Sequence, residues 1–378
     1  MSFVWYEIRP LDTVFFGGGR PFGAGETGFG QAIFPPLPLA FVGAVRAEIA
    51  KNLKVDFGVF KGDGHPILGS PNDLGFLEFR GPFLKKDNKV YLPYPLDFDL
   101  KLTEIGDGVV TSKDLIPSLL TIKEEKPKEK GKGPYLLEET DFKNYLLGKI
   151  DGIRPVSMSG LIKRERRPGI ARERGKRVIK VGHFYIAEHL RIEGRFLFGL
   201  RSDNSRLLPE KGIFYLGGEK RTSAYQKIDI PKGFKECIEG QELKNSLKGK
   251  RRIKFVLLSP GVFKNGFLLD CFERKNNEII FQFDSLPQAK VMAMALGKPR
   301  VVSGWDVANN RPRPALRAVP EGSVYWLEFE QTLNQDQVNT LFDDFYFKPL
   351  PSMQGGFSWQ KAGFGLCALG IWDKEAEK

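Results

Sequence analysis

The chain has few of the residues that build disulfide, metal and acid–base sites. Its 378 residues include three cysteines and three histidines. The cysteines, Cys237, Cys271 and Cys367, lie far apart and form no C-x-x-C pair, so neither a zinc motif nor a disulfide framework is indicated, and a reducing cytoplasm fits. No histidine has metal-ligand spacing, and no G-x-S-x-G motif, carboxylate pair or Asp-rich metal motif occurs. We therefore expect no catalytic residue, no metal ion and no cofactor.

Long apolar runs are absent as well. No apolar run reaches 18 residues, and the N-terminal residues lack both the basic leader and the apolar core of a signal peptide. We expect a protein that is not exported and has no membrane partner. Positive charge, by contrast, is in excess, because 58 Lys and Arg against 46 Asp and Glu leave a formal charge of +12. Phosphates that are neutralised release counterions, so this excess favours nucleic acid as the partner.

Two similar patterns of strands and helices divide the chain. Alternation over residues 3–9 predicts a strand, and apolar residues at three- and four-residue steps after Pro38 predict an amphipathic helix. In the second half, residues 253–257 predict another opening strand and Asn334 begins the capping box of a helix. Residues 366–372 predict a buried closing strand.

These patterns predict an α+β protein with two ferredoxin-like domains, of the kind found in RNA-recognition motifs. The domains would carry long insertions and a glycine-rich loop before the last strand. We predict residues 1–215 as the N-terminal domain and residues 216–378 as the C-terminal domain. Within the first, residues 123–133 mix both charges with proline and glycine, which predicts a mobile, solvated loop.

A glycine-dense loop in residues 12–46 runs through prolines into the first helix. Glycine lets a ligand approach the main chain, and Arg20 and Arg46 offer planar forks suited to phosphate. The glycines match G-x-G-x-x-G, but the helix cannot begin until after Pro35 and Pro36, which argues against a dinucleotide site. The alternative is an ordered surface loop whose glycines only make turns.

The densest positive charge lies in residues 163–180, where nine basic residues face two glutamates. Arginine forks to phosphate and stacks on bases, and Pro168 with Gly169 predicts a hairpin or loop rather than a continuous helix. An exposed charge run without a ligand is the alternative. The arginines predicted to contact RNA here are Arg164, Arg166, Arg167, Arg172, Arg174 and Arg177.

Two later segments add candidates for RNA contact. Residues 298–317 interleave arginines with Trp305, as a stacking platform for single-stranded RNA requires, whereas the alternative is a core tryptophan with Asp306 capping a turn. Residues 354–370 surround a lysine with glycines that permit close backbone approach, although glycine before a strand also marks a bulge. The candidates from both segments are Arg300, Trp305, Arg311, Arg313, Lys361, Gly363 and Gly365.

Together these segments resemble the RAMP superfamily of CRISPR proteins, and within it the subunit-three family of the type III-B (Cmr) effector complex. The motifs RPGIARERG, FYIAEHLR, YLGGEKR, SGWD and RAVPEGSVYWLE stand in the family's order, and Gly363-Phe364-Gly365 lies where the superfamily has its glycine-rich loop. The first loop resembles the family at Asp12, Thr13, Phe16, Arg20, Pro21, Phe22, Ala24, Gly25, Phe34, Pro35, Pro38, Gly43, Ala44 and Arg46.

The resemblance implies a non-catalytic RNA-binding subunit of a ribonucleoprotein in antiviral defence. Such a subunit would hold the 5′ repeat-derived tag of the guide RNA, dock the large polymerase-like Cmr subunit and adjoin neighbouring backbone RAMP subunits. Two alternatives stay open. One is a metal-independent endoribonuclease that processes guide-RNA precursors, because relatives in the superfamily cleave RNA with His or Tyr acid–base chemistry. The other is a scaffold without direct RNA contact, whose basic surface meets an acidic protein.

Overall fold

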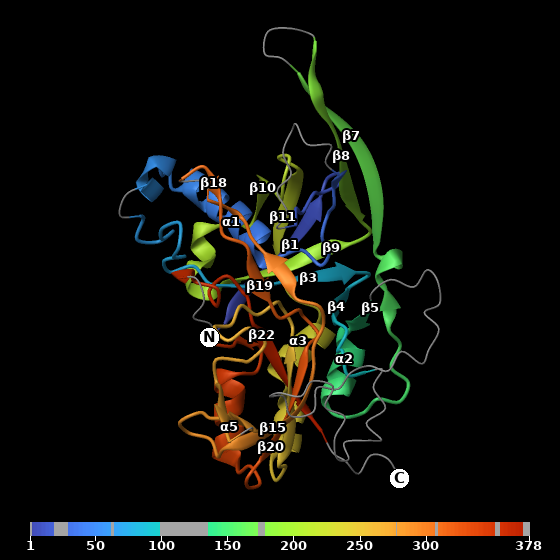
Figure 1. Ribbon diagram of the computed structural model, residues 1–378, viewed down its shortest axis with the longest axis vertical. Coiled ribbons are helices and arrows are strands. Elements are labelled where there is room, and N and C mark those ends of the chain that lie inside the picture. Colours follow the sequence, from blue (N-terminus) through green and yellow to red (C-terminus); the bar gives the residue numbers. More distant parts are fainter. Residues whose placement is uncertain are drawn as a thin grey trace. The chain divides into compact units, whose positions relative to one another are not determined.

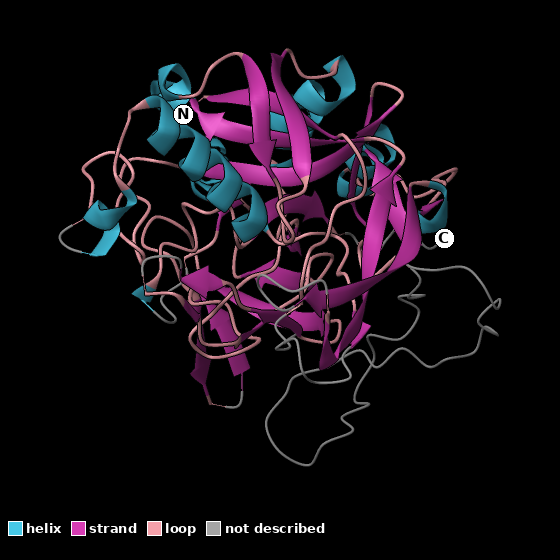
Figure 2. Cartoon of the chain, turned by 90° about the horizontal axis from the view of Figure 1, so that it is seen from above, coloured by secondary structure: helices cyan, strands magenta, loops and turns pink. Residues whose placement is uncertain are grey.

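The computed structural model describes residues 2–18, 29–61, 64–98, 135–172, 178–276, 278–306, 309–351 and 356–372. Strands make up most of the regular structure and helices are few (Figures 1 and 2), so the predicted α+β class is confirmed. The chain forms two compact units, each assembled from three segments. Unit 1 comprises Met1–Asp87, Met158–Asp229 and Val301–Leu316, and unit 2 comprises Asn88–Ser157, Ile230–Arg300 and Arg317–Lys378.

Unit 1 is built on antiparallel strands in the order β10-β11-β1-β9-β3. The aromatic residues of β9 that point to one face pack against Phe41 of the first helix, whose ring centroid lies 5.1 Å from that of Phe196 and 5.3 Å from that of Phe198. The predicted strand and helix at the N-terminus are confirmed. Their bounds, with those of the other strands, are β1 Phe3–Pro10, α1 Pro38–Asn52, β3 Phe79–Lys86, β9 Arg195–Arg201, β10 Lys211–Tyr215 and β11 Thr222–Ile228.

A long antiparallel ribbon of β7 (Ile162–Arg172) and β8 (Ile179–Ile192) also belongs to unit 1. It runs away from the sheet of this unit (Figure 1), and the short strand β2 (Phe29–Gly30) pairs parallel with β8. The prediction of a hairpin or loop rather than a helix in the basic segment is thus confirmed as paired strands, and Pro168 and Gly169 lie within β7. Arg174 and Arg177 between the two strands, and Arg20 in the first loop, lie outside the described residues, and nothing is described of the Arg172 side chain.

The remaining elements of unit 1 are short. Its last segment forms the small hairpin β17–β18, and β16 and β19 lie at the two ends of that segment. The bounds are η1 Phe57–Lys61, η3 Met158–Gly160, η4 Ser202–Leu207, β16 Arg300–Val302, β17 Trp305–Asp306, β18 Arg311–Pro312 and β19 Leu316–Ala318.

Unit 2 is built on a second sheet with the strand order β13-β14-β15-β20-β12-β22-β21. Its core gathers aromatic rings, and the Phe255 centroid lies 5.6 Å from Phe281 and 5.2 Å from Phe345. The sheet strands are β12 Arg252–Leu257, β13 Phe272–Lys275, β14 Glu278–Phe281, β15 Ala289–Ala295, β20 Val324–Phe329, β21 Lys348–Pro349 and β22 Leu366–Ile371. The other elements are β4 Lys89–Pro93, β5 Tyr135–Glu138, β6 Val156–Ser157, α2 Glu139–Leu146, α3 Lys232–Glu239, α4 Gln241–Leu247 and α5 Gln335–Asp344.

Local signals in unit 2 act as predicted. The Asn334 side chain accepts a hydrogen bond from the Gln337 backbone amide at 2.9 Å, and the Gln337 side chain accepts one from the Asn334 amide at 2.9 Å, so the capping box at the start of α5 is confirmed. The predicted opening and closing strands are β12 and β22. The predicted loop 123–133 lies outside the described residues. Within the described ranges, no helix has the length and apolar character needed to cross a membrane.

Candidate RNA interface

Carboxylates at the base of the ribbon hold two of the predicted arginines. Asp12 accepts hydrogen bonds from Arg167 at 2.9 Å and from Arg191 at 3.2 Å, and the bonds from Arg167 are the largest cause that lowers the pKa of Asp12 to about 2. Arg164 pairs with the buried Glu188 and donates to a backbone carbonyl at 3.0 Å. These guanidinium groups therefore tie the ribbon to the chain that follows β1.

Arg166 differs from its neighbours on β7. Its side chain is exposed and, among the described residues, it forms no ion pair. The guanidinium lies over the ring of Phe29, 5.4 Å from the centroid, and Phe29 itself is 48% exposed. A cation stacked on an exposed ring keeps its N–H donors directed outward, so this pair can meet both a phosphate and a base.

Two predicted arginines of unit 1, Arg46 and Arg313, donate hydrogen bonds to the same loop, residues 68–72. Arg46 on α1 donates to the backbone carbonyls of Leu68 at 2.6 Å and Ser70 at 3.0 Å. Arg313 donates to the next residues, to the carbonyl of Pro71 and to the side-chain oxygen of Asn72 at 3.1 Å. Burial is the largest cause that lowers the pKa of Arg46 to about 10, and the charge of the nearby Arg313 acts in the same direction. Both contacts order the loop, and phosphate binding by either arginine stays a prediction.

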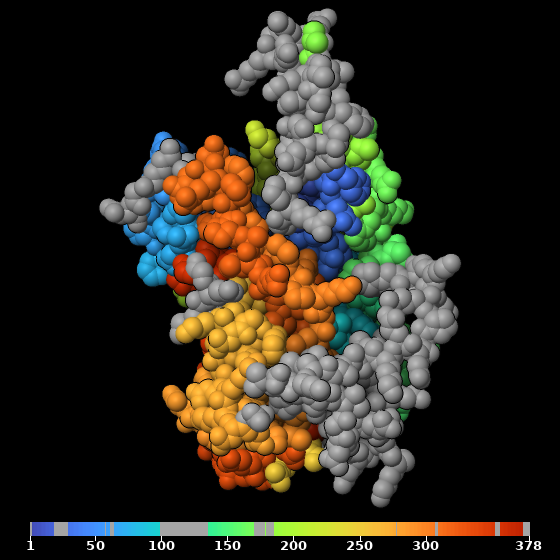
Figure 3. Space-filling view, in the orientation of Figure 1, coloured from blue at the N-terminus to red at the C-terminus, as the bar shows by residue number. Residues whose placement is uncertain are grey.

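The hairpin β17–β18 presents the exposed tryptophan of unit 1. Trp305 is 57% exposed, so the alternative that it anchors the core is wrong. Asp306, paired with Arg311 across the hairpin, accepts hydrogen bonds from the backbone amide and the side chain of Asn309 at 3.2 and 2.8 Å, which confirms that it caps the turn. Arg311 is exposed. In the space-filling view the segment that carries this hairpin, in orange, lies at the surface beside the blue residues of unit 1 (Figure 3).

The candidates in unit 2 lie in well-packed surroundings. Arg300 pairs with Glu321, and both side chains are mostly buried. The carbonyl of Gly363 accepts a hydrogen bond from the Ser259 hydroxyl at 2.7 Å, and the amide of Gly365 donates to a backbone carbonyl at 2.8 Å. Both glycines have positive φ, 89° and 67°, which explains why glycine is needed there. Lys361 on the same loop is half-buried.

His189 is a buried residue whose partners sequence reasoning missed. Its Nδ1 lies 3.2 Å from the Thr13 hydroxyl, and its Nε2 lies 3.1 Å from a carboxylate oxygen of Glu219. Burial lowers the pKa of His189, and Glu219 opposes that shift. The three residues stand far apart in the sequence, so no spacing could have indicated them. Within the described ranges, no group of three or more His, Cys, Asp and Glu side chains forms a metal site.

The fold and this site define a basic α+β protein whose exposed cations and rings lie on paired strands. The family model for CRISPR-associated protein (Cas_Cmr3) matches residues 6–372, which is nearly the whole chain. The chain therefore belongs to this family of CRISPR-associated proteins and is a subunit of a type III effector complex.

Solved structures of two type III complexes contain chains similar to this one. For the cryo-EM structure of the type III-B Cmr-beta bound to cognate target RNA and AMPPnP, the TM-score is 0.49 and the identity 16%, over 90% of this chain and 89% of that chain. For the crystal structure of the Csm3-Csm4 subcomplex of the type III-A interference complex, the TM-score is 0.39 and the identity 16%, over 87% of this chain and 94% of that chain. No curated protein sequence matches the chain. The family assignment rests on the family model.

The buried Trp359 and the exposed Trp305 should differ in how much their loss destabilises the fold. Trp359 is 5% exposed, and its ring centroid lies 5.0 Å from that of Phe364, so Trp359→Ala should cost about 3–5 kcal/mol of unfolding free energy. Trp305→Ala should stay within about 0.5 kcal/mol of the wild type, because its ring is outside the core. Urea denaturation of both variants measures the difference. A large loss at Trp305 would contradict its exposure.

The buried His189 should make stability depend on pH. Because its pKa is lowered from 6.5 in the folded state, the unfolded chain binds more protons, and stability present near pH 7 is lost as the pH falls below about 6.5. His189→Gln removes this titration. We expect the melting temperature of the wild type to fall more than that of the variant between about pH 7.5 and 5.5. Parallel curves would show that His189 does not contribute.

Proposed function

We propose that this protein is the non-catalytic RNA-binding subunit of a type III-B effector complex and holds the 5′ repeat-derived tag of the guide RNA. The observation that carries the proposal is the exposed Arg166 stacked on the exposed Phe29. Single-stranded RNA is bound by combining cations for the backbone with rings for the bases. Family membership and the formal charge of +12 support the same function.

The arginines that already donate hydrogen bonds to protein atoms have a different role from Arg166. Arg167 and Arg164 on the ribbon, and Arg46 and Arg313 at the loop, already donate to protein acceptors, so they position the surfaces that meet the RNA. A tag of constant sequence offers base edges to read, whereas a guide of varying sequence offers only its backbone. We assign the reading of bases to the stacking partners and the grip on phosphates to the exposed arginines.

We also propose that each sheet derives from a ferredoxin-like βαββαβ domain. In unit 1, β1, β3, β9 and β11 follow the spatial order 4-1-3-2, and α1 follows the first strand. In unit 2, β12, β15, β20 and β22 follow the same order, and α5 follows the third strand. Each half would keep one of its two helices and carry strands in place of the other. The boundaries at 1–215 and 216–378 stay a prediction.

As its partners we propose the large polymerase-like Cmr subunit and neighbouring backbone RAMP subunits, joined without a metal ion or other cofactor. Membership of the family supports these partners. Cys237, Cys271 and Cys367 are free, buried thiols, which fits work in a reducing cytoplasm. The scaffold alternative differs in having no direct RNA contact, and RNA binding separates the two.

RNA binding tests the proposal through its dependence on salt. Arg166→Ala should reduce the slope of log affinity against log salt by about 0.7 for one lost contact to a single strand. Trp305→Ala should instead cost about 1–3 kcal/mol with little change in slope, because it removes a stacked ring. Binding of a fluorescent tag oligonucleotide measures both. Arg206→Ala, at an exposed arginine of η4, is the matched control. Wild-type affinity and slope in both variants would leave the scaffold alternative.

We further propose that the protein does not cleave RNA. His189 is buried between Thr13 and Glu219, and the Nδ1 of His65 accepts hydrogen bonds from two backbone amides at 3.2 and 3.3 Å, so both rings are engaged in structural contacts. Incubation with repeat-containing RNA should yield no discrete products. Specific cleavage that disappears in His183→Ala or His189→Ala would favour the endoribonuclease alternative.

A further inference from the structure

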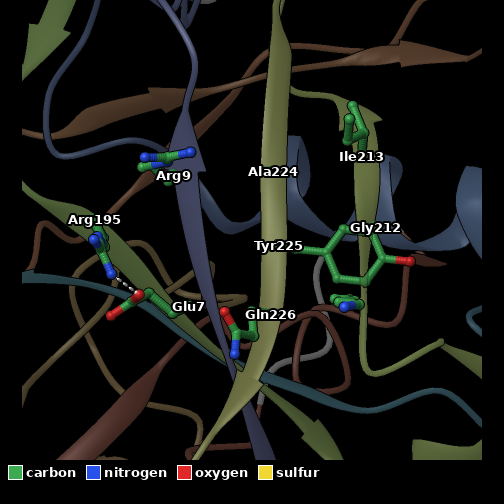
Figure 4. Close-up of a pocket in the computed structure, with 9 residues that line it drawn as sticks. Glu7, Arg9, Arg195, Gly212, Ile213, Ala224, Tyr225 and Gln226 are labelled. Carbon is green, nitrogen blue, oxygen red and sulfur yellow. Dashed lines mark hydrogen bonds and ion pairs between the residues drawn. The ribbon is translucent and has the colours of Figure 1, made fainter.

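One face of the unit 1 sheet carries a hollow of ≈ 480 Å³ (Figure 4). On β1, Tyr6 and Ile8 stand opposite Phe198 and Phe196, the residues that pack on α1. The alternate residues of a strand point to the other face, so Glu7 and Arg9 open onto the side away from α1. There they line the hollow together with Arg195 of β9, Gln226 of β11, and Lys211 and Ile213 of β10.

The hollow has a surplus of positive charge. Its acidic residue, Glu7, accepts a hydrogen bond from Lys85 at 2.6 Å and pairs with Arg195. Burial raises the pKa of Glu7, but these two bonds outweigh burial and lower it, so Glu7 is a carboxylate that is already neutralised. Arg9 and Lys211 are exposed and form no ion pair within the part of the chain that the structure describes. Their charges are available to an anion.

The rim of the hollow is apolar and lies on an edge strand. Ile213 and Tyr215 of β10 are 56% and 62% exposed, and as alternate residues they share the face of Lys211. Among the described strands β10 pairs only with β11, so its other edge is open. Exposed apolar side chains on an open edge promote unwanted association unless something covers them. This combination is what a docking surface requires.

We propose that this face docks an acidic segment of another protein subunit. A carboxylate of that segment enters the hollow between Arg9 and Lys211, and its apolar side chains cover Ile213 and Tyr215. RNA fits this face less well, because sheets that read single strands present stacking rings on their central strands. Here the central positions on β1 are Glu7, which is neutralised, and Trp5, whose ring packs over Gly199 and is buried.

The inference rests on the proposed function only in taking the partner to be a subunit of the same complex. A photo-crosslinking benzophenone residue in place of Ile213, in the reconstituted complex with guide RNA, should label a protein subunit at a peptide that contains Asp or Glu. The matched control places the same residue at Ile150, which is as exposed but lies in unit 2. Labelling of RNA, or labelling no stronger than at Ile150, would overturn the docking surface.

Charge reversal gives a second, independent measurement. Arg9→Glu with Lys211→Glu should weaken incorporation into the complex by roughly tenfold or more, because like charges would then face each other. Arg206→Glu should incorporate as the wild type does, and all variants should keep the wild-type melting temperature and tag-RNA affinity. If the double variant joins the complex as well as the wild type, the docking surface is refuted while the proposed function stands. If the wild type neither joins nor binds RNA, both are refuted.

Discussion

An arginine side chain keeps its charge in a folded protein, so every guanidinium that leaves water must find an acceptor. This constraint sorts the basic residues of the chain into two groups. Where partners are near, as for Arg167 with Asp12, the arginine orders the chain around it. Where none is near within the described ranges, as for Arg166 and Arg9, the charge stays available at the surface. The first group builds the surface, and the second gives it its preference for anions.

Local patterns in the sequence were sufficient to predict some of the strands and helices. Alternation predicted β1, the capping box at Asn334 predicted the start of α5, and Pro168 with Gly169 predicted a hairpin or loop rather than a helix in the basic segment, which forms paired strands. Each depends on residues within a few positions of one another. Each unit, by contrast, is assembled from three separate segments of the chain. Which distant segments pack together is not encoded by any local pattern.

The sequence predicted that arginines form the candidate site, but not which residues those arginines contact. Density of arginine identified the ribbon, yet only the fold shows that Asp12 and Glu165 hold Arg167 while Arg166 stays exposed. Thr13, His189 and Glu219 were out of reach for the same reason, because tertiary packing joins them across long stretches of sequence. Trp305 could be read as core or as surface, since a tryptophan suits both, and burial alone decided it.

The ion pairs that join β7 and β8 to Asp12 and Glu219 form a network in which positive and negative charges are equal in number. Its three arginines, Arg167, Arg191 and Arg221, face three carboxylates, Asp12, Glu165 and Glu219. A balanced, close-packed group contributes little to the long-range field, and its short ion pairs are screened less than charges separated by a Debye length. Salt therefore weakens the attraction between the exposed arginines and a distant anion more than it weakens the short ion pairs of this network. Affinity and geometry are set by different residues, so substitutions in one group can change binding without moving the surface on which it takes place.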